Sequence, residues 1–248
     1  MMKMLNDRFF LKSIILLLIV VPLAAQSQNF SGYNWYFGDS KTGIRFSRSN
    51  NLPSLVQNQA IPFGTGGSAV ASDQSNANLL FYTDGRNVFD VTHTLMSNGN
   101  ISVTTDNTTN QPVAICKVPD QKGLYYIFHR DNTGVVNYSI VDMNQFGNST
   151  FPAPALGAVT VKNIPVPTVP ALIGRSEAMI TIPHANGNEF WLITHESGTT
   201  NYSVTLVQKQ VVVGVPIFTT TTISGLGLLD EAANFSYHPT SKRIAVSP

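Results

Sequence analysis

The stretch 177-EAMITIPHANGNEFWLITHE-196 decides the fold of this chain. It opens with an apolar segment of strand type and continues through Asn186-Gly187, a pair that tolerates the positive φ angles of a tight hairpin turn. A second strand from Phe190 to Thr194 follows, and its side chains are apolar on both faces, as in a strand covered on both sides. His195 and Glu196 are expected to leave this strand at its far end. The stretch therefore predicts a β-hairpin with a buried second strand.

The two histidines of this stretch also raise the question of a metal site. A zinc-protease motif needs a second histidine four residues after the first, on a helix. Thr199 stands four residues after His195, and the surroundings are those of a strand. We therefore expect no metal site here, and a loop-facing or hydrogen-bonded role for His184 and His195.

The same hairpin pattern occurs four times along the chain. The segments begin at Ser68, Pro112, Glu177 and Ala232, so about 44 to 65 residues separate one start from the next. Three of them continue into a third strand. Repeats of about this length with three or four strands are typical of β-propeller blades. We predict an all-β fold, a β-propeller with about four blades of a larger ring and no helical domain.

A blade has two faces that both need cover, and neighbouring blades supply it. The aromatic and aliphatic residues that alternate along the second strands should therefore fill the layers between blades. Their neighbours along the chain, such as Tyr126 and Trp191, are apolar as well. The predicted layer residues are Leu79, Phe81, Tyr125, Ile127, Phe190 and Leu192.

The N-terminus has the features of a secretory signal peptide. Lys3, Arg8 and Lys12 form a basic flank, the run 13–25 is apolar, and small residues follow. We expect a signal peptide at 1–27, a propeller domain at 28–248, a secreted or surface-associated protein, and no membrane span once the peptide is removed.

Composition limits the partners of the mature chain. The net charge is +1 and charged residues make up 12% of the sequence, without the basic patch that nucleic-acid binding requires. The one cysteine, Cys116, stands in an apolar context and is expected to be a buried, unreactive thiol. The sequence shows no cofactor motif and no catalytic constellation.

Polar side chains cluster where the second strands end, and we take these as the candidate ligand-binding residues. They can gather at one rim of the ring or along its channel, where loops from several blades converge. The alternative is that they cap hairpins and face solvent at blade edges. The candidates are Asp84, His129, Asp131, His195 and Glu196.

Three functions remain open at this point. The first is a non-enzymatic module that binds a protein or a glycan. The second is a secreted hydrolase or lyase acting on a polysaccharide, with two of Asp84, Asp131 and Glu196 as acid and base beside His129 or His195. The third is a structural spacer without a ligand.

Several motifs resemble the N-terminal WD40-like propeller region of large Bacteroidetes surface proteins. These proteins carry PKD or Ig-like modules and a gliding-motility-associated C-terminal domain. The resemblance implies export by the type IX system, display on or release from the cell surface, and a role in adhesion, gliding or polymer binding. It transfers no catalytic residue. The motifs are NWYFG at 34–38, NLLFYTDG at 78–85, LYYIF at 124–128, YSIVDM at 138–143 and HANG at 184–187, followed by Trp191 and Thr194-His195-Glu196.

The chain departs from this family at two positions. Phe89 stands where the family often has Trp, and Pro239-Thr240-Ser241 replaces its usual Pro-Asp-Gly turn. Since about four blades are fewer than most propellers use, we expect the chain to be part of a longer protein.

Overall fold

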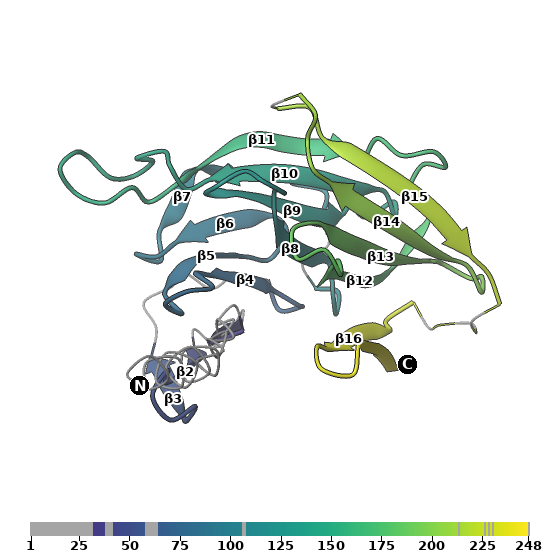
Figure 1. The fold of residues 1–248 in the computed structure, drawn as a ribbon, viewed down its shortest axis with the longest axis horizontal. Coiled ribbons are helices and arrows are strands. Elements are labelled where there is room, and N and C mark those ends of the chain that lie inside the picture. The colour runs from purple at the N-terminus through teal and green to yellow at the C-terminus, as the bar shows by residue number, and fades with distance from the viewer. Residues whose placement is uncertain are drawn as a thin grey trace, which may run out of the picture.

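The computed structural model describes residues 32–37, 42–57, 64–105, 108–212, 214–225, 227, 229 and 231–247. The predicted signal peptide at 1–27 lies outside these residues. Every regular element within them is a β-strand, and none is a helix (Figure 1). The all-β prediction is confirmed.

The strands follow one another along the chain with short connections. In order they are β1 (Asn34–Phe37), β2 (Thr42–Phe46), β3 (Pro53–Gln57), β4 (Ala69–Ser72), β5 (Leu79–Thr83), β6 (Asn87–Asp90), β7 (Leu95–Asn100), β8 (Val113–Lys117), β9 (Leu124–Arg130), β10 (Val136–Asp142), β11 (Ala158–Pro165), β12 (Arg175–Pro183), β13 (Phe190–Glu196), β14 (Tyr202–Gln208), β15 (Ile217–Ile223), β16 (Asn234–His238) and β17 (Arg243–Ser247).

These strands form antiparallel units in which each strand pairs with the next. Three units have four strands, namely β4–β7, β8–β11 and β12–β15, while β1–β3 has three and β16–β17 has two. The four hairpins predicted from the sequence are β4–β5, β8–β9, β12–β13 and β16–β17. The β1–β3 sheet and the fourth strand of each larger unit were not predicted.

The second and third units are joined, which the sequence did not indicate. Their outer strands β7 and β11 meet in parallel at the pair Ser97 and Ala158. The result is one eight-stranded sheet in the order β4-β5-β6-β7-β11-β10-β9-β8. Its end strands β4 and β8 also contact each other, so the sheet nearly closes on itself.

The first strands of successive units lie next to one another. Strand β1 contacts β4, β4 contacts β8, β8 contacts β12, and β12 contacts β16. The β12–β15 sheet packs beside the larger sheet, and the β1–β3 sheet and the β16 hairpin lie along its lower side in Figure 1. Each unit thus packs against its neighbour through its first strand.

The predicted layer residues do fill the space between units. Phe81, Tyr125 and Ile127 share a buried cluster inside the eight-stranded sheet. Leu192 belongs to a second cluster between β8–β11 and β12–β15, and Phe190 packs against that cluster. The prediction that the central strands are covered on both faces is confirmed for β9, where every residue from 125 to 129 is buried.

The turn that opened the sequence analysis is present, and the strand after it is longer than predicted. The His184 carbonyl accepts a hydrogen bond from the Gly187 amide at 3.0 Å, and Gly187 has φ +77°. Strand β13 continues through His195 and Glu196, because His195 pairs with Tyr202 of β14. These two residues therefore end the strand, whereas the sequence placed them beyond it.

A glycine at the start of the second unit tests how tightly the units meet. A Cβ added at Gly67 would lie 2.1 Å from the carbonyl oxygen of Asn110, whereas a Cβ at Gly187 meets nothing within 4 Å. We expect Gly67→Ala to destabilise the protein by about 1 to 3 kcal/mol because the backbone must shift. Gly187→Ala should cost about 1 kcal/mol, from its positive φ alone. Urea unfolding of both variants measures the difference, and a smaller loss for Gly67→Ala would contradict the packing.

Candidate functional site

His129 is fully buried, as is one other of the five candidate residues, His195. Its Nδ1 lies 3.1 Å from Thr105 Oγ1, and its Nε2 lies 3.2 Å from Ser139 Oγ. Burial lowers the pKa of His129 to about 4, against the smaller opposite effect of Asp131. The imidazole is therefore neutral near pH 7, with each ring nitrogen beside a hydroxyl group.

Asp84 follows β5 and is almost completely buried. One carboxylate oxygen accepts hydrogen bonds from the amides of Arg86 and Asn87, both at 2.8 Å. The other accepts a bond from the amide of Gly64 at 3.1 Å. The carboxylate thus holds the β5–β6 turn and ties it to the segment that precedes β4.

Asp131 holds the β9–β10 turn in a similar way. Its Oδ1 accepts bonds from the amide of Thr133 at 2.9 Å, from the Thr133 hydroxyl at 2.7 Å and from the amide of Val135 at 3.0 Å. Burial raises the pKa of Asp131, but these hydrogen bonds outweigh it, so the pKa lies below its ordinary value. The side chain is an ionised cap of the turn.

His195 and Glu196 end strand β13. Because a carbonyl only accepts, His195 Nε2 donates to the Thr199 carbonyl at 2.7 Å, and its Nδ1 lies 3.1 Å from the Ser176 hydroxyl oxygen. Glu196 is partly exposed and accepts a bond from Asn201 Nδ2 at 3.2 Å. Both side chains have partners within their own sheet.

Three of the candidates lie on segments that come close together in the fold. A Cβ on Gly85, the residue after Asp84, would lie 3.5 Å from the His129 Cβ and 2.9 Å from the Thr105 side chain. Thr105 also forms an isolated β-bridge with Asp131. The structure therefore brings the turn that holds Asp84 beside the end of β9, where His129 and Asp131 lie. Ligand binding by these side chains stays a prediction.

The remaining two candidates lie one unit further along, beside charged residues that the sequence did not single out. Arg175 stands opposite Glu196 in the β12–β13 register. Its side chain is buried, and its Nε and Nη1 have no hydrogen-bond partner. Arg130 Nη2 forms an ion pair with Glu231 Oε1 at 2.9 Å. Within the described ranges, no three His, Cys, Asp or Glu side chains form a group that could hold a metal ion.

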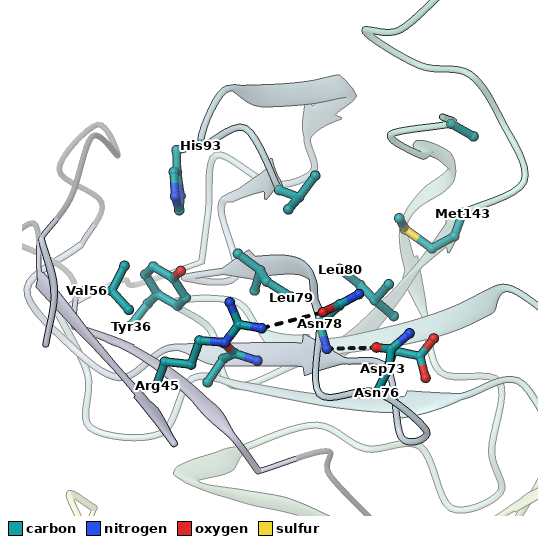
Figure 2. Close-up of a pocket in the computed structure, with 13 residues that line it drawn as sticks. Tyr36, Arg45, Val56, Asp73, Asn76, Asn78, Leu79, Leu80, His93 and Met143 are labelled. Carbon is teal, nitrogen blue, oxygen red and sulfur yellow. Dashed lines mark hydrogen bonds between the residues drawn. The ribbon is translucent and has the colours of Figure 1, made fainter. Parts of the chain in front are cut away.

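A cleft of about 490 Å³ lies elsewhere, between the β1–β3 sheet and the second unit (Figure 2). The β4–β5 hairpin, the β6–β7 turn and the β10–β11 connection complete its walls. None of the five sequence candidates is among its lining residues. Those residues are Asn34, Tyr36, Arg45, Val56, Asp73, Asn76, Asn78, Leu79, Leu80, Val91, His93, Met143 and Ala155.

One side of the cleft is polar. In Figure 2, Arg45 reaches from the β1–β3 sheet toward the β4–β5 hairpin, where its Nη2 lies 3.4 Å from Asn78 Oδ1. The amide of Asn78 donates to Asn76 Oδ1 at 2.8 Å. Hydrogen bonds from Ser75 lower the pKa of Asp73, so this carboxylate is ionised. The cleft thus presents a guanidinium, a carboxylate and amides side by side.

A wall of rings forms another side. Tyr36 stacks on Tyr82 with ring centroids 4.8 Å apart, and the His93 ring is tilted at 5.5 Å from Tyr36. His93 has φ +66°, and Asp90 Oδ1 accepts the Thr92 amide at 2.8 Å to fix this turn. Burial lowers the pKa of His93, against the opposite effect of Asp90. The ring is therefore neutral near pH 7.

Sequence reasoning missed this cleft because no short motif contains it. Its lining residues come from positions 34 to 155 and from four separate parts of the fold. The nearest signals were Asp73, which precedes a hairpin turn, and Tyr36 and Asn78, which belong to the family motifs. Planar polar groups beside apolar and ring side chains can bind the hydroxyls and faces of a small, hydroxyl-rich ligand.

A smaller cavity of about 160 Å³ lies where the first strands β4, β8 and β12 converge. Lys117 lines it and donates from Nζ to Gln74 Oε1 at 2.7 Å. Cys116 lines it as well, and burial raises the pKa of its thiol. The prediction of a buried cysteine is confirmed.

No helix among the residues described has the length and apolar character needed to cross a membrane. Comparisons of this chain with protein-family models, with curated proteins and with solved structures found no match.

Proposed function

We propose that this chain is a WD40-like β-propeller module of an exported surface protein and that it binds a glycan in the cleft beside the β1–β3 sheet. Repeated four-stranded antiparallel units support the propeller. The contacts between successive first strands support it further, since the first strands of propeller blades surround a common centre; β1 contacts β4, β4 contacts β8, β8 contacts β12, and β12 contacts β16. The small cavity between β4, β8 and β12 fits that centre.

The single observation that carries the binding function is the composition of the cleft. Arg45, Asp73 and Asn78 offer both donors and acceptors to sugar hydroxyls. Leu79 and Leu80 supply apolar cover for the carbon faces of a sugar ring. A binding site of this kind needs no reactive group.

The cleft favours binding over hydrolysis. Glycoside hydrolases place two carboxyl groups on either side of the bond that they cleave. Asp73 is the one carboxylate among the described residues that line the cleft, and its Oδ1 already accepts two bonds from Ser75. The carboxylates of Asp84 and Asp131 hold turns elsewhere. We therefore place the hydrolase or lyase second.

Blocking the cleft should abolish glycan binding. Val91 lines the cleft and is 43% exposed, so Val91→Trp can fill the space without disturbing the core. We expect a polysaccharide that binds the unmodified chain to lose at least tenfold in affinity, measured by isothermal titration calorimetry. Val103→Trp, at a residue 72% exposed and outside the lining, is the matched control.

Equal loss in both variants, or no polysaccharide bound by the unmodified chain, would contradict the glycan site.

Export is the other half of the proposal and rests on residues 1–27 and on the family resemblance. Sequencing the N-terminus of the protein recovered outside the cell tests it. A mature chain that begins at Met1 would contradict it.

A further inference from the structure

A second hollow of about 340 Å³ adjoins the cleft on the β2–β3 hairpin. Arg45 lines both spaces, so a ligand in the cleft can extend into the hollow. The residues that line the hollow are Arg45, Phe46, Ser47, Arg48, Ser49 and Ser54. Two guanidinium groups and three hydroxyl groups thus surround one shallow depression.

The charged side chains that line this hollow in the described part of the chain have one sign. No acidic residue occurs between positions 42 and 57, which include the whole hairpin. The carboxylate that lines the adjoining cleft, Asp73, is not among the residues that line the hollow. Among the described residues, the lining of the hollow therefore carries positive charges only, while the lining of the cleft carries one charge of each sign.

The hydrogen bonds that join the two arginines to the β4–β5 hairpin are long. Arg45 Nη2 lies 3.4 Å from Asn78 Oδ1, and Arg48 Nη2 lies 3.5 Å from the Ser75 carbonyl. Bonds of this length to neutral groups are weak, and a charged acceptor makes shorter and stronger ones with a guanidinium. Both side chains reach from the β2–β3 hairpin toward the β4–β5 hairpin, so an anion between them would meet two cations.

The serines add donors to the same spot. The Ser54 hydroxyl donates to the Arg45 carbonyl at 3.0 Å, which holds the hairpin beneath the arginines. Ser47 Oγ and Ser49 Oγ lie 2.9 Å apart, and only one hydroxyl hydrogen is used between them. The other hydroxyl hydrogen is available to an anion.

We propose that this hollow binds the sulfate or carboxylate group of an acidic glycan whose sugar ring occupies the cleft. The inference rests on the proposed function, and it names the class of ligand as an acidic polysaccharide. The planar fork of arginine binds either anion through two parallel hydrogen bonds. Arg45 links the two spaces and would contact both the ring and its acidic substituent.

The test compares polysaccharides in matched neutral and acidic forms. The probes are dextran and dextran sulfate, and fully methyl-esterified and free polygalacturonate. We expect at least one acidic member to bind more tightly than its neutral partner, with an affinity that falls as salt is added. Replacing both arginines (Arg45→Gln with Arg48→Gln) should weaken that binding by tenfold or more, and should weaken neutral binding by a clearly smaller factor, because Arg45 lines the cleft as well and Arg48 does not.

The control variant removes the same charge from the β16–β17 hairpin, through Lys242→Gln with Arg243→Gln. Equal weakening in the control would overturn the site in favour of general charge attraction. A neutral glycan that binds as well as its acidic partner would overturn the acidic class and leave the glycan-binding function intact. Binding of no probe would overturn both. The preferred anion, sulfate or carboxylate, is the one whose matched pair shows the larger ratio of acidic to neutral affinity.

Discussion

Replacing Phe128 with Ala is expected to lower the free energy of unfolding by about 3 to 5 kcal/mol. Phe128 lies on β9 and is fully buried between the third unit and the β12–β15 sheet. Its ring centroid lies 5.6 Å from Tyr126 and 5.9 Å from Phe218, which comes from β15. The substitution leaves a cavity between two rigid sheets, and neither sheet can move to fill it without breaking its own ladder.

Urea unfolding at pH 7 measures this loss. Phe151→Ala is the matched control, because the same side chain there is 82% exposed on the β10–β11 connection. The control should change the free energy of unfolding by no more than about 0.5 kcal/mol. A loss below about 1 kcal/mol for Phe128→Ala would mean that the two sheets do not pack through this ring.

Acidification from pH 6.5 to pH 4 is expected to remove roughly 3 kcal/mol of stability through His129 alone. Burial lowers the pKa of His129 to about 4 in the folded protein. The unfolded chain, with its ordinary pKa near 6.5, then binds a proton first as the pH falls. The contribution of His129 is therefore fully present above pH 6.5 and is lost as the pH falls toward 4.

The carboxylates titrate in a different window. The pKa values of Asp73 and Asp131 are lowered, so their contribution is present above the ordinary carboxyl pKa and is lost below about pH 4. The loss between pH 6.5 and 4 is thus assigned to the two histidines whose pKa values burial lowers, His129 and His93. The free energy of unfolding should therefore fall in two pH ranges, one between pH 6.5 and 4 and the other below about pH 4.

His129→Gln tests this assignment. Glutamine does not titrate and can still bond the hydroxyl groups of Thr105 and Ser139. We expect the variant to be less stable at pH 7 and to lose less stability between pH 6.5 and 4 than the unmodified protein, with His93 as a remaining contributor because its pKa is also lowered by burial. His238→Gln, at an exposed residue of the last hairpin, should keep the slope of the unmodified protein. If His129→Gln keeps that slope, the imidazole is not buried as a neutral group.

The functional proposals depend on the same packing. The cleft exists only because the β1–β3 sheet stands against the second unit, where Tyr36 stacks on Tyr82. The hydroxyl of Ser68 also donates to the Tyr36 carbonyl at 2.7 Å, so β1 is fixed beside the start of β4. Variants in this contact should therefore affect glycan binding and stability together, whereas Arg45 and Arg48 should affect binding alone.

The sequence by itself determined the all-β class, the four hairpins and the layer residues of the central strands. These features are local. The turn depends on the pair Asn186-Gly187 and the strand on the side chains of Phe190–Thr194, so both are set by residues close together in sequence. A strand that is apolar on both faces must be covered on both faces, so the burial of Tyr126 and Ile127 also followed from sequence.

Tertiary structure alone decided which polar residues meet. His129 lies beside Thr105, 24 residues earlier, and Arg45 lies beside Asn78, 33 residues later. The parallel contact of β7 with β11 rests on one residue pair and leaves no pattern in the sequence. Such contacts depend on how whole units pack, and a polar side chain looks the same in sequence whether it caps a turn or lines a cleft.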